Sequence, residues 1–288
     1  MVLPRFEYIS AKSLEEASNL LRELGNGAKI MNGGTDLLPP MNDGILKPTH
    51  LVDIKGIPGL DYIEYDETEG LKIGALTKLR DIEFSKIIKE KNPSIAAAAA
   101  YVASMQVRSK GTIAGNIVNA SPSCDTAPIL MAQNAKVLVH RHDGKKTEIP
   151  MDQFYVGFKK VALEQGDIVI GIVIPPLAAN EKAAYIKHSV RRAMDLAIVG
   201  VAAWVKAEGK KCMDVRITLG AVAITPIRSK PAEDLLKGKE LTDELLGQAG
   251  IAAMDSCKPI SDVRASAEYR ADMVRVFTKR VIQKALEG

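Results

Sequence analysis

The stretch "GTIAGNIVNASPSCDTAPIL" (residues 111–130) is too rich in small residues for a core strand and too irregular for a helix. Thr112, Gly115, Asn116 and Ser121 offer short hydrogen-bond donors, and Asp125 can accept hydrogen bonds from sugar hydroxyls or an adenine amine. These features predict a loop that lies against a phosphate-containing ligand; we call residues 111–125 the second glycine loop. A chain of Asx and Ser turns before a buried helix would produce the same composition.

A first glycine loop, "NGGTDLLPPMNDG" (residues 32–44), follows a predicted strand nearer the N-terminus. The missing side chains of Gly33 and Gly34 allow backbone N–H groups to approach an anion, and Thr35 adds a hydroxyl donor. The loop lacks the lysine of a P-loop and the spacing of a dinucleotide fingerprint. Alone it could be a tight turn, but two such loops, each next to a strand, predict the two sides of a pyrophosphate cradle.

The pattern of apolar residues predicts a mixed α and β chain that ends in a sheet with helices. Ser13 and Glu16 form a capping box for a helix that Gly25 ends. Strands are predicted at 28–34, 51–54, 70–76, 135–141, 146–151 and 167–175, and helices at 77–91 and 94–105. After the boundary at 175–176 come a three-stranded antiparallel meander (183–190, 196–209 and 212–224) and helices at 241–257 and 266–286.

Composition excludes several classes of protein. A formal charge of +4 without a basic and aromatic cluster argues against a nucleic-acid partner. Cys124, Cys212 and Cys257 have no metal-ligand spacing, so we expect no metal site on this chain and no disulfide framework. No apolar run is long enough to span a bilayer, and the N-terminus lacks the apolar core of a signal peptide. We therefore expect a cytoplasmic protein.

The ordered set of motifs resembles the FAD-binding subunit of the molybdenum hydroxylases, the group that contains the xanthine dehydrogenase family and carbon monoxide dehydrogenase medium subunits. The resemblance rests on "NGGTDLLP" and "TIAGNIVNASPSCDTAP", followed by "FYVGFKK", "GDIVIGIVIP" and "KHSVRRAMDLAIV". It extends to "DVRASAEYRADMV" near the C-terminus, so it covers nearly the whole chain. It implies an α+β fold with a two-lobed FAD-binding domain of the vanillyl-alcohol-oxidase/PCMH type. Lobes at 1–57 and 58–176 would hold FAD between them, and residues 177–288 would form a C-terminal three-stranded antiparallel sheet with helices.

The same resemblance implies roles for individual residues. The first loop would wrap the pyrophosphate and ribityl region, the second would meet the pyrophosphate from the other side, and Asp125 would contact the adenosine part. Ile170 would lie near the flavin or adenine, and Lys187 would lie near the isoalloxazine edge, where a cation stabilises negative charge. The matching loop residues are Asn32, Gly33, Gly34, Thr35, Asp36 and Leu37 in the first loop, and Thr112, Gly115 and Asn116 in the second. The chain departs from the family at Ala114, where glycine is common, and at Leu196, where many bacterial relatives have an aromatic residue.

The function implied is that of an electron-transfer subunit in a heterotrimer. A large partner subunit would carry molybdopterin and a small one two [2Fe-2S] clusters, from which electrons would reach FAD on this chain and then NAD or another acceptor. Arg191 and Arg192 could attract an anionic acceptor, although paired arginines are also common at solvated strand ends. Two alternatives remain open at this point: a free-standing FAD oxidoreductase of the same superfamily, and a non-enzymatic interaction subunit whose glycine loops are only turns.

Overall fold

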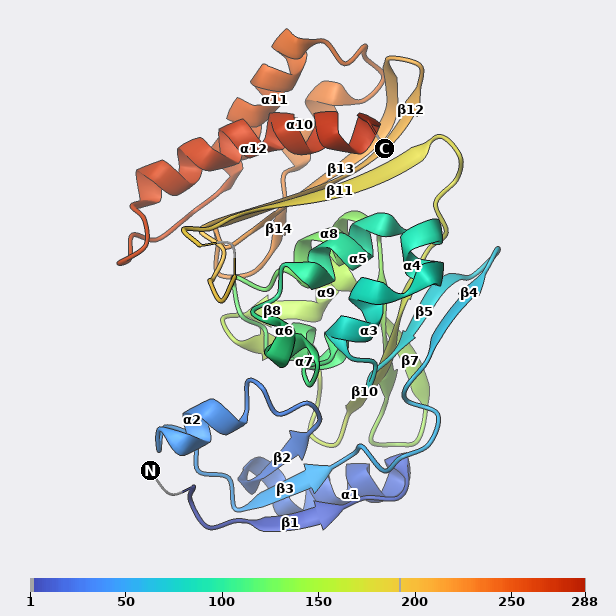
Figure 1. Cartoon of the computed structure of the whole chain (residues 1–288), viewed down its shortest axis with the longest axis vertical. Coiled ribbons are helices and arrows are strands. Elements are labelled where there is room, and N and C mark those ends of the chain that lie inside the picture. Colours follow the sequence, from blue (N-terminus) through green and yellow to red (C-terminus); the bar gives the residue numbers. More distant parts are fainter. Residues whose placement is uncertain (1–2, 192, 288) are drawn as a thin grey trace.

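The structure, a computed structural model, describes residues 3–191 and 193–287. The chain is arranged in three successive parts along its long axis, and Figure 1 shows the N-terminal lobe at the bottom and the C-terminal domain at the top. Each part has its own sheet, and three clusters of buried apolar side chains fill the molecule. The α+β class is confirmed.

The N-terminal lobe is a small parallel sheet with one well-capped helix. Ser13 Oγ accepts the N–H of Glu16 at 3.1 Å, and Gly25 ends the helix with a positive φ of 55°, as predicted. The sheet order is β1-β3-β2, with both pairs parallel. The elements are β1 (Glu7–Ser10), α1 (Leu14–Leu24), a 3-10 turn (Gly25–Gly27), β2 (Ala28–Met31), α2 (Leu38–Asn42) and β3 (His50–Asp53).

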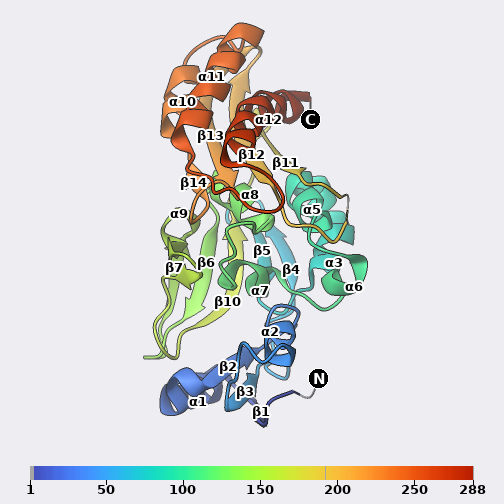
Figure 2. The same cartoon turned by 90° about the vertical axis from the view of Figure 1, so that its left-hand side faces the viewer.

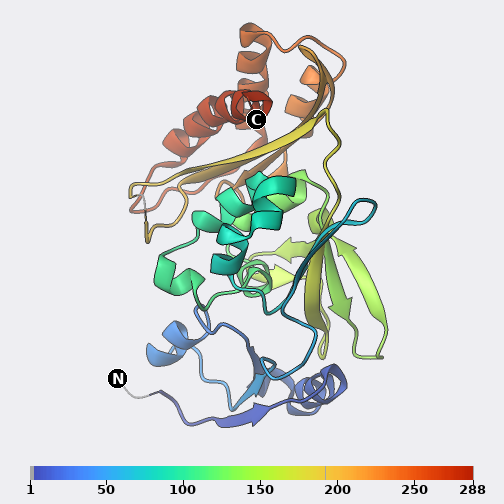
Figure 3. The ribbon, with the colours of Figure 1, turned by 45° about the vertical axis from the view of Figure 1, so that its right-hand side comes forward.

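The middle lobe is a five-stranded antiparallel sheet with helices on one side of it, as seen in Figure 3. Its strand order is β4-β5-β10-β6-β7, from β4 (Ile63–Asp66), β5 (Gly70–Gly74), β6 (Lys136–His140), β7 (Lys146–Pro150) and β10 (Ile168–Ile174). The helices are α3 (Leu79–Phe84), α4 (Lys86–Lys91), α5 (Pro93–Ala100), α6 (Met105–Arg108), α7 (Ile113–Val118), α8 (Thr126–Ala132) and α9 (Met151–Phe154). A hairpin of β8 (Tyr155–Gly157) and β9 (Lys160–Val161) completes the lobe.

Three expectations for the middle lobe were wrong. The helix predicted at 77–91 is two helices, because Ser85 takes an extended ψ of 125° and its hydroxyl caps α4. The next helix ends at Ala100 rather than at 105, since Ala103 has a φ of 44°. The second glycine loop is not free of helix: Thr112 caps the short α7 by accepting the N–H of Gly115 at 3.1 Å. The other interpretation of this stretch expected a buried helix after the loop, and α8 is that helix, since all of its residues are buried.

The C-terminal domain is an antiparallel sheet with a long helix packed on it. It has four strands rather than the predicted three: the two-residue β14 pairs with Thr218 and Leu219 of β13, and is too short to show a strand pattern in the sequence. The strands are β11 (Glu181–His188), β12 (Val199–Glu208), β13 (Lys211–Gly220) and β14 (Ile227–Arg228). The helices are α10 (Lys230–Leu236), α11 (Asp243–Ser256) and α12 (Ala267–Glu287).

This sheet is covered on both faces, which explains its composition. Helices α10 and α12 pack on one face, while α5 and α8 of the middle lobe contact the other. Every residue from Val199 to Val205 is therefore buried, and β12 shows a continuous apolar run instead of an alternating one. No helix within residues 3–191 and 193–287 combines the length and apolar character needed to cross a bilayer.

Candidate functional site

The two glycine loops lie in direct contact with each other. A Cβ atom on Gly33 would come within 2.2 Å of the carbonyl oxygen of Lys110, and one on Gly111 would lie 3.0 Å from Thr35 Oγ1. Only glycine allows the two backbones to approach this closely. Figure 2 shows α7, which continues from this contact, on the side of the middle lobe that faces the N-terminal lobe.

The first loop presents free amide donors. Gly34 has a φ of +73°, and its carbonyl accepts the N–H groups of Leu37 at 3.2 Å and Leu38 at 2.9 Å, which closes the turn before α2. Within the described chain, the backbone N–H groups of residues 33–36 donate to no protein acceptor. Consecutive free amides in a turn of this kind form an anion-binding concavity, so the loop fits a pyrophosphate.

Ile170 lies close to the first loop. The Nδ2 of Asn32 donates to the carbonyl of Ala75 at 2.9 Å, and the N–H of Ala75 donates to the carbonyl of Ile170 at 3.1 Å. Ile170 lies at a bulge of β10, between Val169 and Gly171, and its half-buried side chain packs against the apolar cluster of the N-terminal lobe. The structure thus brings together the first loop, the start of the second loop and Ile170. Asp36 is exposed beside them.

The second loop holds the amide of Asn116 in one orientation. Its Oδ1 accepts from Thr126 Oγ1 at 2.6 Å and from Cys124 Sγ at 3.1 Å. Because these two bonds fix Oδ1, the Nδ2 group faces away from them, and it has no protein acceptor among the described residues. The departure from the family at Ala114 does not crowd this surface, because the Ala114 methyl is buried in the core.

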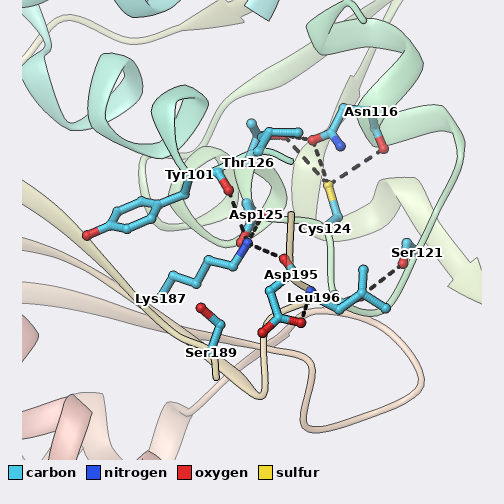
Figure 4. Close-up of polar contacts among 12 residues, drawn as sticks. Tyr101, Asn116, Ser121, Cys124, Asp125, Thr126, Lys187, Ser189, Asp195 and Leu196 are labelled. Carbon is cyan, nitrogen blue, oxygen red and sulfur yellow. Dashed lines mark hydrogen bonds and ion pairs between the residues drawn. The ribbon is translucent and has the colours of Figure 1, made fainter. Parts of the chain in front are cut away.

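Asp125 and Lys187 form a buried ion pair between the middle lobe and the C-terminal domain (Figure 4). Lys187 Nζ lies 2.8 Å from Asp125 Oδ2, and their side chains are 5% and 7% exposed. The same ammonium donates to the carbonyls of Tyr101 at 3.0 Å and Asp195 at 2.8 Å, so its three N–H bonds all have protein acceptors. The hydroxyl of Tyr185 donates to Asp125 Oδ1 at 2.9 Å. Burial raises the pKa of Asp125, and Lys187 opposes that rise.

Tyr185 is not among the site residues predicted from the sequence. The signal was present, because residues two apart on a strand point to the same face, and Tyr185 precedes Lys187 by two on β11. His188 points the other way, and its Nε2 lies 3.0 Å from the hydroxyl of Tyr269. Arg191 is exposed and its backbone N–H donates to Asp195 Oδ2 at 2.9 Å. Arg192 lies outside the described residues.

Comparisons with known proteins agree with this architecture. Residues 4–177 match the family model "FAD binding domain in molybdopterin dehydrogenase", and residues 184–285 match "CO dehydrogenase flavoprotein C-terminal domain". The carbon monoxide dehydrogenase medium chain of Hydrogenophaga pseudoflava is 35% identical over 99% of this chain and 98% of its own length. The xanthine dehydrogenase FAD-binding subunit of Escherichia coli O157:H7 is 31% identical over 97% of this chain and 95% of its own.

Solved structures extend the likeness to three dimensions. A carbon monoxide dehydrogenase structure from Hydrogenophaga pseudoflava matches with a TM-score of 0.95 and 36% identity over 100% of this chain and 99% of that one. Quinoline 2-oxidoreductase from Pseudomonas putida 86 matches with a TM-score of 0.92 and 28% identity, and covers 100% of this chain and 99% of that one. The PCMH-type FAD-binding fold is therefore confirmed, and the chain belongs to the FAD-binding medium subunits of the molybdenum hydroxylase family of oxidoreductases.

Proposed function

We propose that this chain takes electrons from the [2Fe-2S] clusters of a small partner subunit and passes them to NAD or another acceptor. In this proposal a large partner subunit carries molybdopterin, and the three subunits form a cytoplasmic heterotrimer. The observation that carries it is the contact of two glycine loops beside four amide groups that have no acceptor among residues 3–191 and 193–287. Relatives named as a medium chain and as an FAD-binding subunit match 99% and 97% of this chain, and these names support the division of cofactors among partners.

The residues that would hold FAD lie on both sides of the loop contact. FAD, when bound, supplies chemistry that can accept two electrons together and release them singly. Amides of residues 33–36 would donate to the pyrophosphate from one side, and the free Nδ2 of Asn116 would donate from the other. The proposed division has two lobes that flank FAD, residues 1–57 and 58–176, and a third domain, residues 177–288.

Lys187 has a specific place in the proposal. All three of its N–H bonds are donated to protein oxygens, so a direct bond to the isoalloxazine ring would require it to release one carbonyl. We therefore propose that Lys187 acts near the cofactor mainly by fixing the position of Asp125 and of the carbonyl of Asp195. Among the described residues, each Asp125 oxygen accepts one side-chain hydrogen bond, which would leave a second lone pair on each for the adenosine part of FAD.

The experiment that tests the function is a visible absorption spectrum of the purified chain, with mass analysis of what heating releases. Flavin bands and released FAD, together with co-purifying molybdopterin and iron–sulfur subunits, are the expected result. Reduction of NAD by the complex under anaerobic conditions would identify the acceptor. A chain that carries FAD but never associates with such partners would support a free-standing flavin oxidoreductase, and one that cannot bind FAD in any assembly would refute the proposal.

A further inference from the structure

We infer that the C-terminal domain positions the second glycine loop, so that side chains of its sheet that need not touch the cofactor determine how tightly FAD binds. This inference rests on the proposed function and deepens it. Thr218 and Tyr185 are the positioning residues it assigns. Neither is in the glycine loops, and both act through backbone or side-chain atoms of residues 122–128.

Donors from the C-terminal sheet bind acceptors of the second loop and α8. The N–H of Ala221 donates to the carbonyl of Pro122 at 2.8 Å, and Thr218 Oγ1 donates to the carbonyl of Pro128 at 2.6 Å. Arg216 Nε reaches the carbonyl of Ala132 at the end of α8. With the bonds from Tyr185 and Lys187 to Asp125, these contacts span the segment from the end of the loop to the end of the helix.

The sheet is shaped to receive this segment. Gly200 and Gly220 are opposite each other in the register of β12 and β13. A Cβ atom on Gly200 would lie 2.6 Å from the Tyr185 hydroxyl, and one on Gly220 would lie 2.8 Å from Pro128 Cγ. Gly200 therefore leaves space for the Tyr185 hydroxyl, and Gly220 leaves space for Pro128 of α8.

Backbone strain gathers at the same junction. Of the six non-glycine residues with positive φ in the described chain, five lie at or beside it: Ala103 (44°), Ala120 (49°), Asn134 (53°), Met194 (55°) and Ala221 (64°). Two of them bond directly, since the N–H of Met194 donates to the carbonyl of Ala103 at 3.1 Å. Ala120 is itself in the second loop. Left-handed backbone is unfavourable at the three alanines and the methionine, and it persists where the surroundings determine it. At Ala103, Met194 and Ala221 the surroundings include hydrogen bonds across this junction.

The test compares Thr218→Val with a matched control, Thr278→Val. Both threonines are fully buried, but Thr278 Oγ1 has no partner among the described residues and lies in α12. For each variant, in the assembly in which the wild type is isolated, we would measure the dissociation constant of FAD and amide hydrogen exchange in residues 111–125. One lost hydrogen bond of ordinary strength corresponds to about a two- to tenfold rise in the FAD dissociation constant.

We expect Thr218→Val to raise the FAD dissociation constant by that factor and to speed exchange in the loop, while Thr278→Val changes neither. Tyr185→Phe should have the same effect as Thr218→Val. Adding Ala120→Gly to Thr218→Val should restore part of the affinity, because glycine accepts the positive φ without strain. Unchanged exchange in the loop of Thr218→Val, or an equal effect of the control, would overturn the inference. A wild type that binds no FAD would instead refute the proposed function, and the exchange data would still decide whether the sheet positions the loop.

Discussion

Replacing Lys187 with Met should destabilise the protein strongly, and more so at neutral than at acidic pH. The substitution keeps an apolar stem of similar length but removes the ammonium that neutralises Asp125. It also leaves the carbonyls of Tyr101 and Asp195 without their donor. Removing one partner of a buried ion pair typically costs about 3–5 kcal/mol, because the other charge stays buried without compensation.

The chemistry of the carboxyl group sets an upper limit on the part of the cost that comes from the unpaired charge. Asp125 can escape the penalty by taking up a proton, and from an ordinary pKa of 3.8 this costs about 1.4 kcal/mol per pH unit above that value. The limit on this charge part is therefore about 4 kcal/mol at pH 7 and about 1.6 kcal/mol at pH 5. Because the pKa of Asp125 is higher in the folded state than in the unfolded state, the variant loses stability as pH rises from about 4 toward neutrality.

Urea unfolding at pH 5 and pH 7, followed by the fluorescence of Trp204, would measure this. Trp204 is the single tryptophan, and it is buried in the core that the middle lobe shares with β11 and β12. The double variant Lys187→Met/Asp125→Asn should recover the pH-dependent part of the loss, because no charge is left unpaired. A loss below about 1 kcal/mol that is the same at both pH values would refute the argument, since it would mean that water screens the pair.

Three further predictions use other sites. Gly33→Ala should abolish FAD binding, measured by the flavin absorbance of the isolated protein, because its Cβ would lie 2.2 Å from a carbonyl oxygen of the facing segment; retained FAD would contradict the loop contact. In α11, Gly247→Ala should stabilise the protein by about 0.5–1 kcal/mol, since nothing lies within 4 Å of the new Cβ. Gly250→Ala should destabilise it by about 1–3 kcal/mol, because the new Cβ would lie 2.4 Å from a carbonyl oxygen of α12. Thermal unfolding that ranks the two variants the other way would refute this packing. The backbone N–H of Arg264, together with a buried arginine, lowers the pKa of Asp262 to about 2, so the stabilisation it gives is present above pH 3.8 and is lost as pH falls toward 2. The difference in unfolding free energy between wild type and Asp262→Asn should therefore shrink across that range, and a constant difference would contradict it.

Local elements could be predicted where short-range rules decide them. The cap at Ser13 and the end of its helix at Gly25 follow from rules that act within a few residues, and the structure has both. The break at Ser85 could not be predicted, because a continuous helical pattern does not reveal where the chain must bend to bury both of its halves. The two-residue β14 is likewise formed by its neighbour and not by its own sequence.

The sequence by itself determined the class of the fold, the position of the two glycine loops and, through the order of its motifs, the family. These depend on backbone freedom at glycine, on capping and on periodic burial, which act between residues close in the chain. Only the tertiary structure decided that the loops touch at Gly33, and that Lys187 pairs with Asp125, 62 residues away, while Tyr185 secures the other oxygen. Such pairs form because folding buries both groups in one place, and burial across that distance depends on the packing of the whole chain.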